Sequence, residues 1–286
     1  MNGYENLTEC LMREVRDRFS VSCKPDINLV WLELTGCSGN IISLLDGSQP
    51  NFTFLITHMI RFIYNNSLMA AEGNAAMQKL KSVVATPYIL AVEGAVATAN
   101  DGYYNIIGQM DGKPLTALAA LKMLGERAKS VIAVGACASH GGISSAFPNP
   151  AHCVGIQDVL TRKVIQLPGC PCHPDWFVGT LAYLLLYGEP ELDRMNRPVM
   201  FYAHTIHDRC ERRSLFDRGV FAQKLGDGGC MFKLGCRGPV TRIDCPVRKW
   251  NGRTNWPVGA STPCIGCAQF GFPDKMEPFI SYDTTK

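Results

Sequence analysis

The stretch TPYILAVEGAV, residues Thr86–Val96, gives the clearest indication of the fold of this chain. It is an apolar run that stops at small residues. Three other runs share this character, and they are INLVWLEL (Ile27–Leu34), SVIAVGACAS (Ser130–Ser139) and VIQLPGC (Val164–Cys170). Nearly continuous apolar runs of this length are typical of strands that are covered on both faces of a sheet. Residues 86–96 therefore predict a buried strand of a parallel sheet.

Helix-like stretches lie between these runs. They cover Ala70–Val84, Pro114–Ala128 and Ile156–Arg162, and the second stretch places Pro114 at the first helical position. Apolar strands that alternate with helices predict an α/β domain with helices on both faces of a parallel sheet.

Four chemically distinctive residues stand at or just after the ends of the predicted strands. They are Cys37, Glu93, Cys137 and Cys170. Ligands of open parallel sheets gather beyond the carboxyl ends of the strands. We therefore expect these four side chains to meet at one edge of the sheet and to form a site there.

The last hundred residues have a different character. Regular hydrophobic periodicity fades after residue 185, and Gly, Pro, Cys and Arg become frequent. A segment so poor in regular elements buries little apolar surface by itself and usually needs a metal or disulfides to stabilise it. The predicted organisation is an N-terminal helical extension (1–24), an α/β domain (25–185) and an irregular domain (186–286).

Composition excludes several classes of protein. The chain has 286 residues, of which 47% are hydrophobic and 19% charged, so global disorder is excluded. A net charge of +3 does not suit a dedicated nucleic-acid binder. The apolar run Trp176–Tyr187 is shorter than the ~20 residues that cross a bilayer.

No signal-peptide pattern is seen at the start of the sequence, and we therefore expect a cytoplasmic protein, with peripheral attachment to the inner membrane face left open.

The cysteines are the most informative residues. Eight of the 13 lie between Cys170 and Cys267. Reduced thiols are the rule in the cytosol, so we expect metal or redox use instead of disulfides. The pair Cys264-x2-Cys267 suits zinc, but no second C-x2-C follows at zinc-ribbon spacing. Iron–sulfur clusters accept scattered cysteines and tolerate histidine. The count favours iron–sulfur clusters, with zinc and purely structural thiols as alternatives.

The order and spacing of nine short segments make the chain resemble the small, electron-transferring subunit of [NiFe] hydrogenases. The segments are WLELTGCSGN (Trp31–Asn40), VEGAV (Val92–Val96), GACASHGGI (Gly135–Ile143), PNP (Pro148–Pro150), LPGCP (Leu167–Pro171), HDRCERRSLFD (His207–Asp217), GDGGCMFKLGCRGPVT (Gly226–Thr241), WNGRTNWP (Trp250–Pro257) and PCIGC (Pro263–Cys267).

The resemblance implies a fold, a function and partners. The fold would be a flavodoxin-like domain followed by an irregular domain that binds iron–sulfur clusters. The chain would relay electrons from H2 oxidation at the Ni-Fe centre of a separate large subunit through proximal, medial and distal clusters. The acceptor would be a quinone or a redox protein. An obligate heterodimer, assembled into a higher oligomer, is expected, of an uptake or cytosolic type without a signal peptide.

The resemblance also implies ligands for two of the clusters. A distal [4Fe–4S] cluster would be bound by His207, Cys210, Cys230 and Cys236. A medial [3Fe–4S] cluster would be bound by Cys245, Cys264 and Cys267, because Pro257 stands where some relatives carry a further cysteine.

The proximal site departs from the family pattern. Cys37, Cys137 and Cys170 match three of its ligands, but Asn40 replaces the second cysteine of the usual C-x-x-C. Cys172 stands where a proline is usual. The simplest interpretation is that Cys172 supplies the missing thiolate and the cluster stays [4Fe–4S]. The alternatives are an oxygen ligand from Asn40 or a [3Fe–4S] cluster with an open corner.

Two other functions remain open at this point. One is the cluster-bearing subunit of a related quinone or deazaflavin oxidoreductase, which would share the first domain but not the His207-x2-Cys210 pair or the PCIGC segment. The other is a zinc-stabilised adaptor, which would be colourless.

Overall fold

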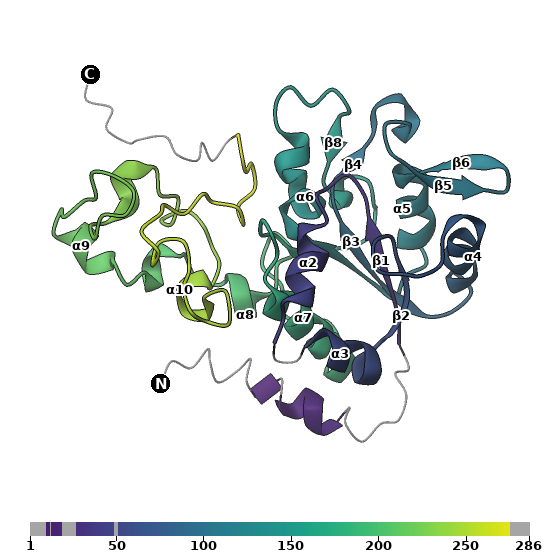
Figure 1. Cartoon of the computed structure of the whole chain (residues 1–286), viewed down its shortest axis with the longest axis horizontal. Coiled ribbons are helices and arrows are strands. Elements are labelled where there is room, and N and C mark those ends of the chain that lie inside the picture. Colours follow the sequence, from purple (N-terminus) through teal and green to yellow (C-terminus); the bar gives the residue numbers. More distant parts are fainter. Residues whose placement is uncertain (1–9, 12, 19–26, 49–50, 275–286) are drawn as a thin grey trace.

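A five-stranded parallel sheet forms the centre of the larger domain (Figure 1). The computed structural model describes residues 10–11, 13–18, 27–48 and 51–274. The strand order is β2-β1-β3-β7-β9, and every neighbouring pair is parallel. The strands are β1 (Asn28–Glu33), β2 (Arg61–Asn65), β3 (Tyr88–Glu93), β7 (Ser130–Val134) and β9 (Ile165–Leu167). The predicted α/β class is confirmed.

The strands are apolar on both sides because helices cover both faces of the sheet. Alternate residues of β1 separate into two cores: Leu29 and Trp31 pack into one, and Val30 and Leu32 into the other. The first core contains side chains of α2 (Gly39–Leu45) and α7 (Pro174–Leu186). The second contains side chains of α4 (Gly73–Val83) and α5 (Ala117–Gly125).

Three of the expected elements differ in the structure. The run Ser130–Ser139 is a strand only to Val134, and α6 (Gly135–His140) follows it. A turn with positive φ at Gly135 makes this abrupt change possible, since glycine has no Cβ to clash there. The stretch Ile156–Arg162 forms only the short 3-10 helix η4 (Ile156–Asp158).

Pro114 does not begin a helix. It lies in β6 (Lys113–Thr116), which pairs with β5 (Ile106–Met110) as a hairpin that the sequence analysis missed. Helix α5 begins afterwards, where Thr116 Oγ1 accepts a hydrogen bond from the backbone N–H of Ala119 at 3.1 Å. A threonine cap of this kind satisfies one of the free N–H groups of the first turn, so the helix starts here and not at the proline.

The remaining elements are short. In the larger domain they are α3 (Phe52–Phe54), the π-helix η1 (Leu55–Met59), β4 (Val96–Ala97), η2 (Ala99–Gly102), η3 (Gly142–Ser145) and β8 (Cys153–Val154). After Leu186 they are α8 (Val199–Tyr202), η5 (His207–Arg209), α9 (Arg213–Asp217), η6 (Met231–Leu234) and α10 (Cys245–Arg248). The irregular character predicted for the end of the chain is confirmed for the described residues, whereas the domain boundaries stay predictions.

Most of the expected N-terminal extension (1–24) lies outside the described residues. Residues 10–11 and 13–18 are helical. Leu11 and Val15 are buried against the core that contains α7. In the described part of the chain, no helix has the length and apolar character needed to cross a bilayer.

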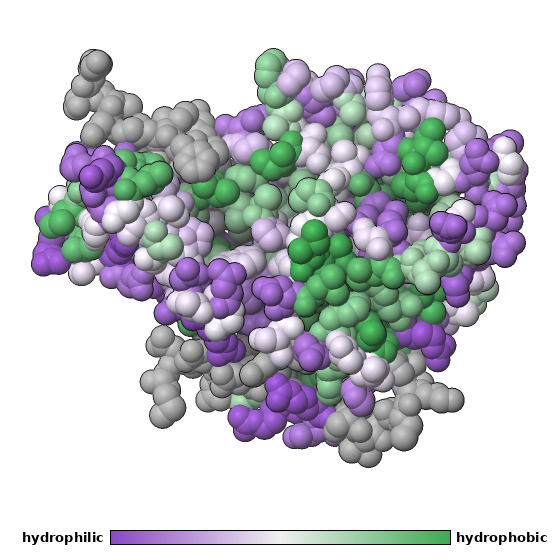
Figure 2. Space-filling view, in the orientation of Figure 1, coloured by the Kyte–Doolittle hydropathy of each residue, from purple (hydrophilic) through white to green (hydrophobic). Residues whose placement is uncertain are grey.

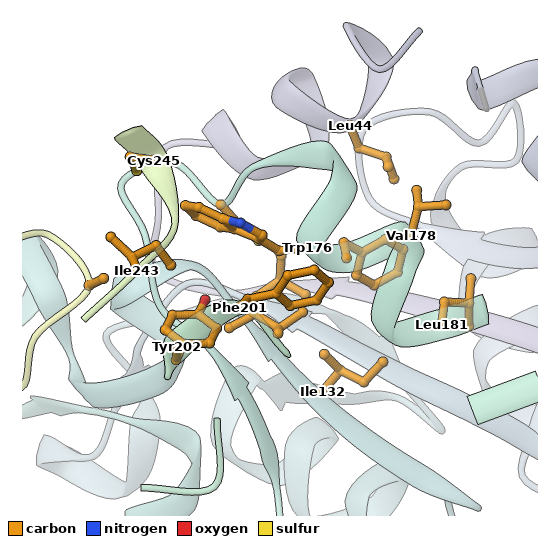
Figure 3. Close-up of a cluster of buried hydrophobic side chains, with 14 of the residues drawn as sticks. Leu44, Ile132, Trp176, Val178, Leu181, Phe201, Tyr202, Ile243 and Cys245 are labelled. Atoms are coloured by element: carbon orange, nitrogen blue, oxygen red, sulfur yellow. The ribbon is translucent and has the colours of Figure 1, made fainter. Parts of the chain in front are cut away.

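The two parts of the chain share one hydrophobic core (Figure 3). Trp176 of α7 packs with Tyr202 of α8 at 6.0 Å between ring centroids. Ile243 and Cys245 from the irregular domain belong to the same cluster of buried side chains. This continuity fixes the loop-rich domain against the sheet.

A buried ion network adds a second connection between the domains. Arg248 of α10 contacts Asp244 at 2.6 Å and Asp175 of α7 at 2.9 Å. The Trp176 indole N–H donates to Asp244 at 2.8 Å. Burial lowers the pKa of Arg248, but the two carboxylates outweigh this and raise it above its ordinary value. The arginine therefore stays charged and pairs both carboxylates.

We expect Arg248→Ala to destabilise the protein by about 3–5 kcal/mol, because the buried carboxylate of Asp244 and the partly buried one of Asp175 would lose their shared cation. Urea unfolding of the purified complex, followed by tryptophan fluorescence, measures the change. Lys81→Ala is the matched control, since it removes an exposed ion pair to Asp111 that is worth at most ~1 kcal/mol. Equal effects of the two substitutions would contradict the assignment.

Candidate iron–sulfur centres

Three of the expected proximal ligands lie together at the carboxyl edge of the sheet. Cys37 follows β1, Cys137 is in α6 after β7, and Cys170 follows β9. Burial, followed by the neighbouring thiols of Cys267, Cys137 and Cys37, raises the pKa of Cys170 to about 12. Like charges have such an effect only at short range. The topology thus gathers these sulfur atoms as the strand ends predicted.

Asn40 is close to this group but is held by other partners. Its Nδ2 donates to Glu93 at 2.9 Å, and its Oδ1 accepts a hydrogen bond from the backbone N–H of Cys172 at 2.7 Å. Glu93 also accepts from the backbone N–H groups of Asn40 and Ile41 and from the Trp31 indole. Burial raises the pKa of Glu93, although these donors oppose the shift. The amide of Asn40 is thus a fixed part of the scaffold.

Cys172 is placed differently from the other three cysteines. Its side chain is buried in the core shared with Trp176 and Phe177, and its Sγ lies 3.5 Å from the carbonyl oxygen of His173. Burial, followed by the charge of Glu93, raises the pKa of this thiol. The structure therefore gathers Cys37, Cys137 and Cys170, while the role of Cys172 as a fourth ligand stays a prediction.

The four expected distal ligands line one small cavity. His207, Cys210, Cys230 and Cys236 face it together with Met231 and Phe232, among other residues. The backbone N–H of Arg212 donates to Cys210 Sγ at 3.4 Å. Burial, followed by the charge of Arg213, lowers the pKa of His207, and this shift favours the neutral imidazole that a metal ligand requires.

The expected medial ligands line a second, larger cavity of about 600 Å³. Cys245, Cys264 and Cys267 face it, and Pro257 lies on the same wall. The indole N–H of Trp256, which also lines this cavity, has no hydrogen-bond partner among the described residues. A three-thiol cavity with an orphaned N–H donor fits a sulfide-containing cluster, since sulfide accepts hydrogen bonds.

The medial cysteines lie between the other two groups. The backbone N–H of Cys264 donates to the distal Cys236 Sγ at 3.4 Å. On the other side, the proximal Cys170 lines the same cavity as Cys267. Burial raises the pKa of the Cys267 thiol, and a hydrogen bond from the backbone N–H of Cys170 opposes this shift. The three groups of donors therefore form a continuous row from the sheet edge to the far end of the irregular domain.

Within the described ranges, no three His, Cys, Asp or Glu side chains are close enough to hold a single metal ion.

Two contacts to these sulfur atoms were not predicted from the sequence. Ser144 Oγ lies 3.6 Å from Cys137 Sγ. The side chain of Trp250 donates a hydrogen bond to Cys245, which lowers the pKa of that thiol against the effect of burial. Trp250 belongs to the segment WNGRTNWP, which carries part of the resemblance. Residue spacing alone does not predict that its side chain contacts Cys245.

Comparison with protein families agrees with this geometry. Residues 202–280 match the C-terminal family of the NiFe/NiFeSe hydrogenase small subunit. Residues 37–184 match the family "NADH ubiquinone oxidoreductase, 20 Kd subunit". The second family accounts for the first domain alone. The match of residues 202–280 distinguishes this chain from a relative that shares only that domain.

Curated relatives and solved structures point the same way. The chain is 40% identical to a periplasmic [NiFe] hydrogenase small subunit of Nitratidesulfovibrio vulgaris, over 93% of this chain and 85% of the relative. It is 38% identical to an uptake hydrogenase small subunit of Afipia carboxidovorans, over 90% and 71% of the two chains. Its fold matches a solved [NiFeSe] hydrogenase of Desulfovibrio vulgaris Hildenborough with a TM-score of 0.85 and 33% identity, over 89% and 97% of the chains. The chain therefore belongs to the small subunits of [NiFe] hydrogenases, which transfer electrons through iron–sulfur clusters.

Proposed function

We propose that this chain relays electrons one at a time from the Ni-Fe centre of a large subunit, through three clusters, to an acceptor at the distal end. The observation that carries the proposal is the row of donors in which the Cys264 N–H donates to the distal Cys236 Sγ and the proximal Cys170 lines the same cavity as Cys267. Bound iron–sulfur clusters supply one-electron transfer. The residues of this chain hold the clusters in sequence.

The proposed cluster types follow from the donors. His207, Cys210, Cys230 and Cys236 supply four ligands for a distal [4Fe–4S] cluster. Cys245, Cys264 and Cys267 supply three for a medial [3Fe–4S] cluster, and Pro257 on the same cavity wall has no donor for a fourth iron.

For the proximal cluster we propose Cys37, Cys137 and Cys170 as thiolate ligands. The packing favours a [3Fe–4S] cluster with an open fourth corner over a fourth ligand from Asn40 or Cys172. Asn40 already donates to Glu93 and accepts from the Cys172 N–H. The Cys172 thiol is buried, whereas Cys37 and Cys170 are exposed at the sheet edge.

The large subunit is proposed to cover the proximal edge as an obligate partner. Cys37 and Cys170 are exposed there. Exposed apolar residues follow the ligands in sequence: Ile42 follows Cys37, and Ile143 and Phe147 follow Cys137. Figure 2 shows a hydrophobic patch over α2. Obligate interfaces are large and apolar, so we expect the chain to be insoluble alone and soluble when co-expressed with its partner. A soluble, cluster-loaded monomer would contradict this.

We further propose a cytoplasmic location, either free or peripheral to the inner membrane face. The support is that Cys153 and Cys172 are free thiols, and free thiols persist in reducing compartments. The two relatives named above are described as periplasmic and as uptake subunits. Cell fractionation with activity staining decides between the compartments.

Trp250 gives a test of the medial assignment. Its N–H donates to Cys245, and such a bond stabilises the more negative, reduced form of a cluster. We expect Trp250→Phe to lower the medial midpoint potential. A tenfold change in the reduced-to-oxidised ratio corresponds to ~59 mV for one electron. Redox titration of the medial electron paramagnetic resonance (EPR) signal measures it.

The distal signal of the same sample is the internal control for Trp250→Phe, because Trp250 does not line the distal cavity. A shift of both potentials, or of neither, would contradict the assignment of Trp250 to the medial site.

EPR on the anaerobically purified heterodimer tests the proposed function itself. An oxidised [3Fe–4S] cluster is paramagnetic and an oxidised low-potential [4Fe–4S] cluster is not. The proposal expects the three-iron signals to disappear under H2. Signals that persist under H2, while the enzyme still consumes H2, would show that the clusters do not carry its electrons.

A further inference from the structure

The positive charge of the chain is concentrated around the distal cavity. Residues 207–242 contain eight Lys or Arg and four Asp or Glu. The 206 residues before them contain fifteen basic and seventeen acidic residues. The slight overall excess of +3 therefore arises at this end of the molecule and not in the sheet domain.

The acidic residues of this segment are mostly engaged within the chain. Asp208 accepts from the backbone N–H of Thr205, and Asp227 accepts from the N–H groups of Gln223 and Lys224. Asp217 pairs with Arg213. By contrast, Arg218 and Lys224 are exposed and have no acidic partner within the described part of the chain. The eight basic residues of this segment outnumber its four acidic ones, Glu211 among them, so the net charge of this surface is positive.

Exposed apolar side chains lie among these charges. Val220 is 47% exposed and Leu225 60% exposed. Figure 2 shows hydrophilic and hydrophobic surface side by side at the end that carries α9. We call the surface formed by Arg213, Arg218, Val220, Lys224 and Leu225 the distal face. A small apolar patch within a ring of charge is the composition of transient protein–protein interfaces.

The distal face is built directly on cluster ligands. Phe216 of α9 packs against the His207 ring at 4.6 Å, edge to face. The carbonyl oxygen of Val220 accepts from the backbone N–H of Cys230 at 2.9 Å. Phe232, which lines the distal cavity, contacts Phe216 at 5.2 Å. The distal face is therefore in direct contact with residues that hold the distal donors.

We propose that the distal face docks an acidic one-electron carrier protein, and that this carrier is the acceptor of the relay. The inference rests on the proposed function and specifies its acceptor. Complementary charge speeds encounter and orients a weak partner. The face lies at the end of the molecule farthest from the sheet (Figure 1), away from the proximal edge assigned to the large subunit. A basic carrier would be repelled there.

The experiment uses the complete heterodimer and two forms of one carrier. Native cytochrome c is basic, and its fully succinylated form has the same haem on an acidic surface. H2-dependent reduction of each form is measured from low to high salt. We expect kcat/KM to be about tenfold higher for the succinylated form at low salt and to fall steeply with salt for that form alone.

Charge reversal localises the effect. Arg218→Glu with Lys224→Glu should lower kcat/KM for the acidic form about tenfold and leave reduction of a small redox dye unchanged. The matched control is Lys113→Glu with Lys122→Glu, which makes the same change of charge on exposed residues of β6 and α5. It should leave both activities unchanged.

The outcomes separate this proposal from the relay itself. Loss of dye reduction in the unmodified enzyme would contradict the relay. Normal dye reduction with equal rates for both cytochromes, or equal effects of the two double variants, would overturn only the docking proposal. Binding to phosphatidylglycerol vesicles that is lost in Arg218→Glu/Lys224→Glu, without discrimination between the cytochromes, would assign the face to an anionic membrane instead.

Discussion

Replacing Cys264 with serine is expected to remove the medial cluster and to destabilise the distal one. Cys264 lies between the two sites: burial and the thiols of Cys236 and Cys267 raise its pKa, and its N–H donates to Cys236 Sγ. Buried thiolates so close together are stable only when metal neutralises them, so cluster binding and folding of this domain are coupled. Loss of one ligand should therefore affect more than one site.

The expected result of Cys264→Ser is loss of the medial three-iron EPR signal, a fall in iron that exceeds one cluster, and a lower thermal midpoint. Iron analysis and calorimetry of the heterodimer measure these changes. Cys153→Ser is the matched control, because Cys153 is a buried thiol that lines neither the medial nor the distal cavity. If Cys264→Ser kept full iron content and the native midpoint, the coupling would be refuted.

Introducing a cysteine at residue 40 should convert the proximal site. Asn40 stands where the family motif has its second cysteine, and Gly135 packs directly against the Asn40 amide. Asn40→Cys would supply a fourth thiolate beside Cys37. We expect it to add one iron and to replace a three-iron signal with a low-potential [4Fe–4S] cluster. The lost hydrogen bonds to Glu93 should cost about 1–3 kcal/mol of stability.

Cys172→Ser completes this test. If Cys172 is not a ligand, the substitution leaves the proximal signal and the iron count unchanged, because its thiol then binds no iron. A loss of proximal iron in Cys172→Ser, together with no gain in Asn40→Cys, would show that Cys172 is the fourth ligand.

The sequence predicted the sheet domain because its strands are read from local apolar runs. It also predicted the meeting of Cys37, Cys137 and Cys170, because strand ends in a parallel sheet share one edge. The strand β2 was missed, since its residues RFIYN (Arg61–Asn65) are polar at both ends and only partly buried. The end of β7 was missed because apolar character continues into α6.

Other features of the site depend on contacts that no local pattern contains. Arg248 joins α10 to Asp175 across 73 residues, and Trp250 folds back over Cys245. The orientation of Cys172 is set by the neighbours of its side chain in the core. Because side-chain direction at an irregular turn follows from tertiary packing, the family pattern alone does not decide whether Cys172 is the fourth ligand, and that assignment stays a prediction.

Iron and acid-labile sulfide in the anaerobically purified heterodimer, counted per small subunit, test the central claim most directly. Three clusters on the proposed donors require about ten or eleven iron atoms, depending on the proximal corner. A count of about four to eight, or zinc in place of iron, would contradict a relay of three clusters in this chain.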